Sequence, residues 1–218
     1  MKLILKPFGI LACLLVVLLS SCADRNSVTY GPDGKPIRDG QHFNPYEPGT
    51  YDHFKAEKDY PKNMKVWRDE SVLARTGPAN ARIVVSLNMQ RAFLMNGQDV
   101  AMDYPISSGT SSRPTPPGEY VILEKIVDKA SNAYGKVYDA DGNRIYGEET
   151  PAAVPEGGKF VGAPMPYWMR LTWDGIGHHI GPIPKGRYPA SHACIRGLRA
   201  AVPTVYEKVK VGTPVVVR

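Results

Sequence analysis

The residues best suited to chemistry in this chain lie between positions 178 and 196. Three of the five histidines, His178, His179 and His192, fall in this stretch, and so does one of only three cysteines, Cys194. A cysteine attacks a carbonyl as its thiolate, so it needs a base or a lowered pKa. The pattern predicts a nucleophile, Cys194, served by one of the histidines.

The spacing leaves the identity of the base and two alternative readings open. His192 lies two residues before Cys194, whereas a hairpin-like return of the chain would be needed to bring His178 or His179 beside the thiol. Three histidines and a cysteine can also bind zinc, but the paired Cys-x2-Cys or His-x3-His spacing of zinc sites is missing. A buried, unreactive thiol among structural histidines is the second alternative.

Strand-like segments around this stretch predict a mostly β domain over residues 81–218. The segments are 83–87, 91–95, 100–106, 119–127, 167–180 and 215–217. The Asn96-Gly97 pair, between the second and third, predicts a two-residue hairpin in which both residues have positive φ. The order of the segments predicts an antiparallel meander rather than a βαβ repeat.

A short helix is expected directly after the cysteine loop. Leu198, Val202, Val205 and Val209 repeat at spacings of 4, 3 and 4, which is one face of an amphipathic helix. Pro203 is tolerated only in its first turn, so the helix begins just before that residue. With the meander, this predicts a mostly β, mixed-sheet sandwich with the cysteine loop at its rim and one short helix after that loop.

A Gly- and Pro-punctuated segment, residues 128–166, interrupts the predicted strands. We expect a long loop, and loops of this length in compact domains are usually lids or binding loops. Asp139–Asn143 resembles part of a calcium loop, but the further ligands and the closing glutamate are missing. This short piece therefore favours a plain turn.

The first 21 residues have the pattern of a lipoprotein signal peptide. Lys2 and Lys6 precede a twelve-residue apolar run, Phe8–Leu19, which is too short for a permanent membrane span. The run ends in Leu-Ser-Ser-Cys, the pattern of a bacterial lipoprotein cleavage site, so Cys22 is expected to carry lipid and to anchor the protein in a membrane. The alternatives are a plain secretory signal with an accidental Cys22, or a retained transmembrane anchor.

Cleavage at that site would change which cysteines remain in the mature protein. Cys13 leaves with the signal, Cys22 becomes the anchor, and Cys194 is the one thiol left. An exported domain with a single cysteine cannot form an internal disulfide, and a free thiol is a liability in an oxidising compartment. The presence of a free thiol at Cys194 therefore needs an explanation, which is either catalysis or burial in an unreactive environment.

Composition and charge favour an exported, tethered protein. Residues 22–63 are rich in Gly, Pro, Asp and Asn without apolar periodicity, which predicts a flexible and largely disordered tether. Residues 64–80 form a lead-in, with a short helix expected near Met64 that packs through Val66, Trp67, Val72 and Leu73. The net charge of +6 is mild, and basic clusters interleaved with aromatics are missing, so nucleic acid is not indicated as a partner.

The cluster Ser191-His192-Ala193-Cys194-Ile195-Arg196, preceded by a histidine at a loop's distance, resembles the signature of the L,D-transpeptidase catalytic domain (YkuD-type). The resemblance covers about 81–218. It extends to the opening strands, to Ser107–Thr110, to Thr115–Tyr120, to Pro164–Leu171 and to Gly212–Val215.

The resemblance implies a reaction and a set of roles. Cys194 would attack the L,D peptide bond of a peptidoglycan tetrapeptide stem, and the acyl group would pass to an amine acceptor, on a second stem or on a protein. His179 is implied as the base, preferred to His178, because the family's histidine is followed closely by glycine and is oriented by the next backbone carbonyl. Ser191 and His192 would shape the thiol's surroundings, and Arg196 would bind a substrate carboxylate or brace the loop.

One departure from the family pattern bears on activity. The family has glycine where this chain has Ala193, and a positive φ there would cost about 1 kcal/mol or more. The alternatives to transpeptidation are therefore L,D-carboxypeptidase trimming with water, or a weakly active peptidoglycan-binding lipoprotein. We expect a monomer without metal or cofactor in the cell envelope, on the outer membrane where the cell has one.

Overall fold

The computed structural model describes residues 28–218, which fall into two compact units divided after Phe43. The first unit contains a small antiparallel sheet of β1 (Thr29–Tyr30), β2 (Pro36–Arg38) and β3 (Gln41–His42). The predicted signal peptide and Cys22 lie outside the described residues. Within residues 28–218, the helices are all too short to span a membrane.

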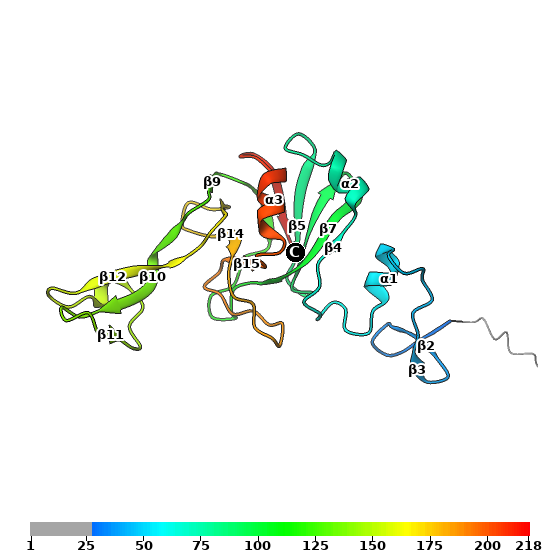
Figure 1. The fold of residues 1–218 in the computed structure, drawn as a ribbon, viewed down its shortest axis with the longest axis horizontal. Helices are drawn as coiled ribbons and strands as arrows, with labels where there is room; N and C mark the ends of the chain where they lie inside the picture. Colours follow the sequence, from blue (N-terminus) through cyan, green and yellow to red (C-terminus); the bar gives the residue numbers. More distant parts are fainter. Residues whose placement is uncertain (1–27) are drawn as a thin grey trace, which may run out of the picture. The chain divides into compact units, whose positions relative to one another are not determined.

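Ten strands of the second unit form one mixed sheet (Figure 1), in the order β8-β16-β5-β6-β7-β15-β14-β13-β9 with β4 also paired to β7. Neighbouring strands are antiparallel except for β16–β5 and β14–β15, which are parallel. The strands are β4 (Trp67–Arg68), β5 (Ala81–Ser86), β6 (Arg91–Asn96), β7 (Asp99–Ser107), β8 (Gly118–Val121), β9 (Glu124–Ile126), β13 (Trp168–Arg170), β14 (Gly177–Ile180), β15 (Ile195–Gly197) and β16 (Pro214–Val217). The β5–β6–β7 run confirms the predicted meander.

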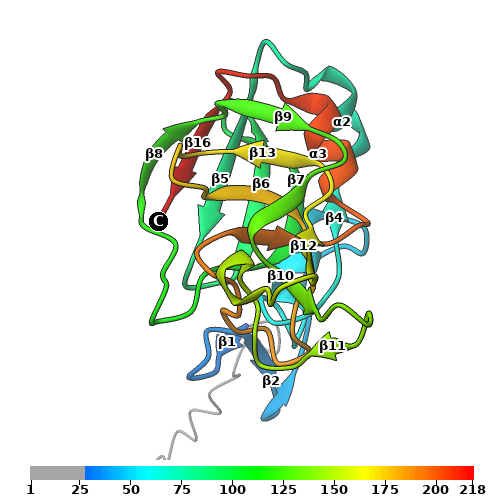
Figure 2. The same ribbon diagram turned by 90° about the vertical axis from the view of Figure 1, so that its left-hand side faces the viewer.

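The sheet curls so that its two halves share one apolar core. Figure 2 shows β9, β13 and β14 crossing in front of β5 and β6. Val85 and Leu94 of one half and Met169 and Ile195 of the other are fully buried in the same cluster. Helix α3 (Val202–Lys208) adds the buried Val202 and Val205, with Pro203 in its first turn as expected. The structure confirms a mostly β, sandwich-like fold with a short helix after the cysteine loop.

The predicted hairpin between β6 and β7 is present, but its turn starts one residue later. Asn96 pairs with Asp99, so the two-residue loop is Gly97-Gln98. Gly97 has a φ of 57°, whereas Asn96 and Gln98 keep ordinary negative values. A glycine at the first loop position is the arrangement of a II′-type turn, which matches the twist of the flanking strands.

The expected single strand over 119–127 is wrong, because the chain changes sheet halves at Ile122. The side chain of Ile122 is fully buried, and its amide donates to Thr213. This pivot separates β8 from β9, which lie at opposite ends of the strand order. The segment 167–180 likewise divides into the β13–β14 hairpin. Apolar alternation reports burial and cannot show where a strand changes partner.

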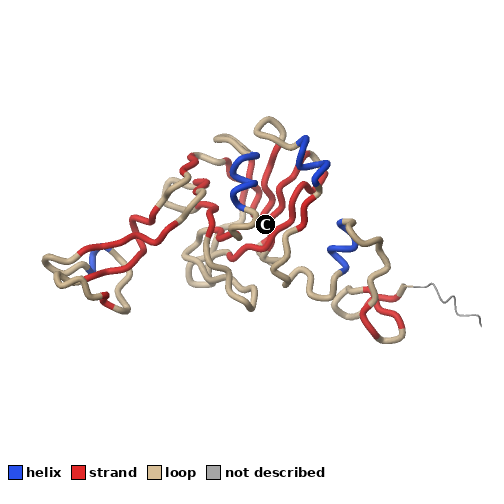
Figure 3. Tube along the Cα trace, viewed as in Figure 1, coloured by secondary structure: helices blue, strands red, loops and turns tan. Residues whose placement is uncertain are grey.

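The expected long loop over 128–166 is also wrong, because the segment forms a second sheet, called here the inserted sheet. It has the order β11-β10-β12, from β10 (Ala130–Tyr138), β11 (Arg144–Ile145) and β12 (Lys159–Pro164), with a 3-10 turn η1 at Pro151–Ala153 (Figure 3). Only Val137 of β10 is buried, so neither face produces an apolar alternation. The Asp139–Asn143 turn is confirmed by the hydrogen bond from the Asp139 amide to the Asn143 carbonyl.

Residues 44–68, called here the strap, correct the expectation of a disordered tether reaching residue 63. They belong to the second unit and contain α1 (Tyr51–Ala56), capped by the Thr50 hydroxyl. The hydroxyls of Tyr51 and Tyr60 both donate to Asp103 on β7, at 2.9 and 3.1 Å. The tyrosines of this polar segment thus anchor it to the sheet.

The strap is held by a buried ion pair. Arg91 and Asp103 are completely buried and pair with each other. The Arg91 guanidinium also donates to the carbonyl of Pro61 at 3.2 Å and of Lys65 at 2.9 Å. The helix expected near Met64 instead begins later, as α2 (Glu70–Arg75), because Asp69 caps it.

Candidate active site

The two strands that carry the candidate residues run parallel, side by side. His178 pairs with Ile195 and His179 with Arg196. The expected hairpin-like return is therefore wrong: residues 181–194 form a crossover that brings the cysteine to the start of the neighbouring strand. Because successive strand side chains point to opposite faces, the two histidines face different surroundings.

His178 is a structural residue. Its ring is buried, with Nε2 3.0 Å from the Tyr104 hydroxyl and Nδ1 2.8 Å from the Ile195 carbonyl. A carbonyl only accepts, so Nδ1 carries the proton and the tyrosine donates to Nε2. Burial lowers the pKa of His178 to about 4, which keeps it neutral. With both nitrogens engaged, His178 has no lone pair left for a substrate.

His179 keeps one nitrogen available. Its Nδ1 lies 2.8 Å from the carbonyl of Ile180, so Nδ1 carries the proton and Nε2 is an acceptor. The ring lies beside Trp168, with centroids 5.8 Å apart. Burial lowers the pKa of His179 to about 4, with smaller lowering by His178 and Arg196. His179 is thus a neutral imidazole with its tautomer fixed for accepting a proton.

Cys194 lies against the start of the strand that carries His179. Its Sγ is 3.6 Å from the Gly175 carbonyl, and the Gly177 amide donates to the sulfur. The strand register puts Cys194 opposite Gly177, hence on the face that carries His179 and Arg196. Burial raises the pKa of the thiol, although the Gly177 amide and Arg196 act in the opposite direction. The same face of the two strands therefore carries a thiol at Cys194 and a neutral imidazole at His179.

Ala193 has the left-handed backbone that glycine would adopt without strain. Its φ is 75°. The Thr115 hydroxyl donates to the Ala193 carbonyl at 2.7 Å and accepts from the Gly109 amide at 2.9 Å. A Cβ at Gly109 would lie 2.7 Å from the Ala193 Cα, so these backbones are in close contact. The loop holds the strained residue in place through Thr115.

Ser191 and Arg196 brace the same loop. The Ser191 hydroxyl donates to the Cys194 carbonyl, and its amide donates to Ser108 at 3.0 Å. The Arg196 guanidinium donates to the Ala190 carbonyl at 3.0 Å, and its stem packs on Gly181. Of the two roles considered for Arg196, these contacts are those of a brace.

The crossover is also fastened by a residue that the sequence did not single out. Arg187 is buried and donates to the carbonyls of Ile106 at 2.7 Å and Gln90 at 2.6 Å. Burial, with repulsion from Arg91, lowers the pKa of Arg187 to about 10. The roles of Arg187 and Tyr104 have no local sequence signal, because their partners, Gln90, Ile106 and His178, are distant in the sequence.

His192 is directed to the inserted sheet instead of the base position. Its ring centroid is 4.3 Å from that of Tyr134 on β10. A hollow of about 460 Å³ lies here, between His192 and the inserted sheet. The sequence could not reveal this neighbour, because residues 128–166 gave no strand signal.

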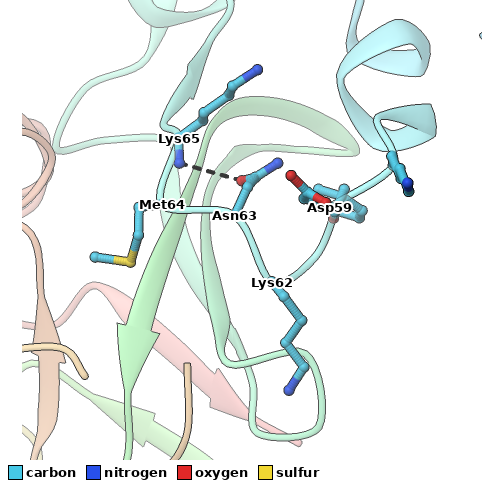
Figure 4. Close-up of a pocket in the computed structure, with 7 residues that line it drawn as sticks. Asp59, Lys62, Asn63, Met64 and Lys65 are labelled. Atoms are coloured by element: carbon cyan, nitrogen blue, oxygen red, sulfur yellow. Dashed lines mark hydrogen bonds between the residues drawn. The ribbon is translucent and has the colours of Figure 1, made fainter. Parts of the chain in front are cut away.

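A larger hollow, of about 790 Å³, runs along residues 58–65 and contains none of the candidate residues. Figure 4 shows the side chains of Lys62, Met64 and Lys65 pointing in different directions around it, with the Lys65 amide donating to Asn63 at 3.3 Å. Over residues 28–218, His, Cys, Asp and Glu form no group that could hold a metal ion.

Comparison with known proteins places the chain in a family. The family model of the L,D-transpeptidase catalytic domain matches residues 80–217, and the chain belongs to this family. Among curated proteins, none is similar enough in sequence to count as a match.

Solved structures similar to this chain include several L,D-transpeptidases. One from Mycobacterium smegmatis is 23% identical over 64% of this chain and 58% of its own, with a TM-score of 0.49. One from Stackebrandtia nassauensis is 17% identical (66% and 59%, TM-score 0.46), and one from Mycobacterium tuberculosis 22% (64% and 57%, TM-score 0.46). This chain thus spans less than two thirds of each of these proteins.

Proposed function

We propose that this protein is a peptidoglycan L,D-transpeptidase with Cys194 as the nucleophile and His179 as the base. The observation that carries the proposal is the fixed tautomer of His179 on the strand beside Cys194. Nδ1 is held by the Ile180 carbonyl, which leaves Nε2 to take the thiol proton. His178, by contrast, has both nitrogens engaged.

In the first half-reaction Cys194 attacks the carbonyl of the diamino acid at position 3 of a tetrapeptide stem. The thiol proton moves to His179 Nε2 as the C–S bond forms, because the resting pair is neutral. The tetrahedral intermediate then expels D-alanine, whose nitrogen takes that proton from the imidazolium. The product is a thioester on Cys194 and free D-alanine.

The negatively charged oxygen of that intermediate is on the carbon bonded to Sγ, so hydrogen-bond donors close to Cys194 are needed to stabilise it. The backbone amides of Ala193 and Cys194 donate in none of the hydrogen bonds among residues 28–218. The positive φ of Ala193 turns this stretch of backbone sharply just before the thiol. These two amides are our candidates for the oxyanion site.

In the second half-reaction an amine attacks the thioester, an amide bond forms, and the C–S bond breaks. The sulfur leaves as thiolate and regains a proton through His179. Attack by water instead would give the L,D-carboxypeptidase reaction, with a tripeptide stem as product. The two outcomes differ only in the acceptor.

The proposal is tested with purified protein and peptidoglycan fragments bearing tetrapeptide stems. Wild type is expected to give cross-links between two position-3 residues, and Cys194→Ala none, in a mass-resolved digest. If wild type gives trimmed tripeptides and no dimers, the reaction is hydrolysis and not transpeptidation. Equal products from both proteins would remove Cys194 from the mechanism.

We further propose that Cys22 carries lipid and holds the enzyme at the cell envelope, with residues 23–43 leading to the catalytic unit. The support is the sequence pattern alone, because Cys22 lies outside the described residues. Metabolic labelling with a fatty acid should mark the wild type and not Cys22→Ser. Label on both proteins would contradict the anchor.

A further inference from the structure

The hollow beside His192 lies between two parts of the second unit. One wall is the loop that carries Arg113, together with His192, which is two residues from Cys194. The other wall is the inserted sheet, which supplies Tyr134 from β10 and the adjacent Glu148 and Glu149. Its volume of about 460 Å³ is in the usual range of small-ligand sites, roughly 300–1,000 Å³.

The walls carry charges of both signs. Arg113 donates to the Tyr134 hydroxyl at 3.1 Å with the guanidinium 5.3 Å from the ring centroid, so one side of the guanidinium is fixed. Arg113, Glu148 and Glu149 take part in none of the ion pairs formed within residues 28–218. Their charges are therefore available to a ligand.

These charges lie close to the catalytic loop. The pKa of His192 is lowered by burial and by Arg113, and Glu149 acts in the opposite direction, so both side chains act on His192 through space. Arg196, which acts on the Cys194 thiol, acts on His192 as well. The backbone carbonyl of Glu149 accepts from the Gly135 amide at 2.9 Å, which fixes the acidic segment to β10.

The combination selects a ligand class. Carboxylates bind an ammonium group, and a guanidinium binds a carboxylate, preferably with two parallel hydrogen bonds. A hollow that carries both groups and is lined by His192, two residues before Cys194, fits a molecule whose amine and carboxylate share one carbon. Water as an acceptor would not need a carboxylate or a guanidinium to bind it.

We propose that this hollow is the acceptor subsite, in which Glu148 and Glu149 hold the ammonium and Arg113 the carboxylate of an amino-acid head group. This inference rests on the proposed function and deepens it, because it favours an amine acceptor over water. On a stem peptide that head group is the free end of a diamino dicarboxylic residue. Of the two protons that the ammonium loses, one goes to solvent and one to sulfur as the C–N bond replaces the C–S bond.

The test uses two acceptor stems that differ in one group. A tripeptide stem with diaminopimelate has a carboxylate beside its side-chain amine, and the stem with lysine lacks it. Transfer is expressed relative to hydrolysis of the same acyl-enzyme, so any effect on acylation cancels. Arg113→Gln should lower this ratio roughly tenfold or more for the diaminopimelate stem and leave it unchanged for the lysine stem.

The acidic residues are tested with the same two stems. Glu148→Gln with Glu149→Gln should lower the ratio for both stems to a similar extent, because both carry the amine. Glu156→Gln, an exposed change in the turn before β12 and outside the hollow, is the matched control and should change the ratio for neither stem.

Unchanged ratios in the Arg113 and glutamate variants, with acyl-enzyme forming normally, would overturn the subsite and leave the proposed function standing. A loss with Arg113→Gln that is equal for the two stems would overturn the carboxylate contact. If wild type forms no acyl-enzyme at all, the proposed function fails, and the subsite fails with it.

Discussion

Ala193 adopts a φ of 75°, which costs an alanine more than a glycine. Ala193→Gly is therefore expected to raise the free energy of unfolding, by about 1 kcal/mol. Urea unfolding measures the change. Ala133→Gly, on exposed β10 with ordinary backbone, is the control and should destabilise slightly. A loss of stability in Ala193→Gly would contradict the strain.

The two adjacent histidines are expected to separate by function. His179→Asn keeps a donor for the Ile180 carbonyl but removes Nε2, so acyl-enzyme formation should slow by roughly 10²–10⁴-fold with little change in stability. His178→Gln should instead lower stability, because it breaks the Tyr104–His178–Ile195 chain of hydrogen bonds. Rapid-quench mass spectrometry and urea unfolding measure the two effects. The reverse pattern would make His178 the base.

The pH at which acylation falls on the acidic side should lie far below the usual pKa of a histidine. The base works only as neutral imidazole, and burial lowers the pKa of His179 to about 4. Acylation is therefore expected to persist through pH 6.5 and to fall only as the pH approaches about 4. Single-turnover rates against pH give the profile. A midpoint near 6.5 would mean that His179 is solvated or is not the base.

At the scale of elements, the strap depends on Arg91. Replacing one partner of a buried ion pair leaves the other charge uncompensated, so Arg91→Met is expected to cost about 3–5 kcal/mol. Hydrogen exchange should increase first in residues 51–65, because Arg91 holds the Pro61 and Lys65 carbonyls at the end of this segment. Arg75→Met, in the half-exposed pair with Asp99, should cost less than about 1 kcal/mol. Equal losses of stability in Arg91→Met and Arg75→Met would contradict the role of Arg91 in holding the strap.

The elements that the sequence predicted are those whose signals are local. The β5–β6–β7 meander and α3 followed from alternation, from one glycine turn and from helical spacing. The inserted sheet was missed because Val137 is the one buried residue of its strands, and the strap was missed because its anchors, Tyr51 and Tyr60, bond to a distant Asp103. The cluster around Cys194 was evident from the sequence, and the resemblance to the family favoured His179 over His178. The partners of the His178 ring, Tyr104 and the Ile195 carbonyl, could not be predicted, because they lie on other strands.

At the scale of the whole molecule, the two buried histidines link stability to pH. Both have pKa values of about 4 when folded and ordinary values near 6.5 when unfolded. The unfolded chain thus binds protons first as the pH falls, and stability is lost between about 6.5 and 4, by about 3 kcal/mol for each histidine. Urea unfolding across this window measures the slope. His178→Gln should make it shallower, and an unchanged slope would contradict the linkage.

Intact-protein mass spectrometry of the enzyme with a tetrapeptide stem tests the central claim most directly. Wild type is expected to gain the mass of the tripeptidyl group, with one D-alanine released for each adduct. A protease digest of the adduct should place that mass on the peptide that contains Cys194. Cys194→Ala should show neither. D-alanine released equally by both proteins, or an adduct on another residue, would contradict the assignment of Cys194 as the nucleophile.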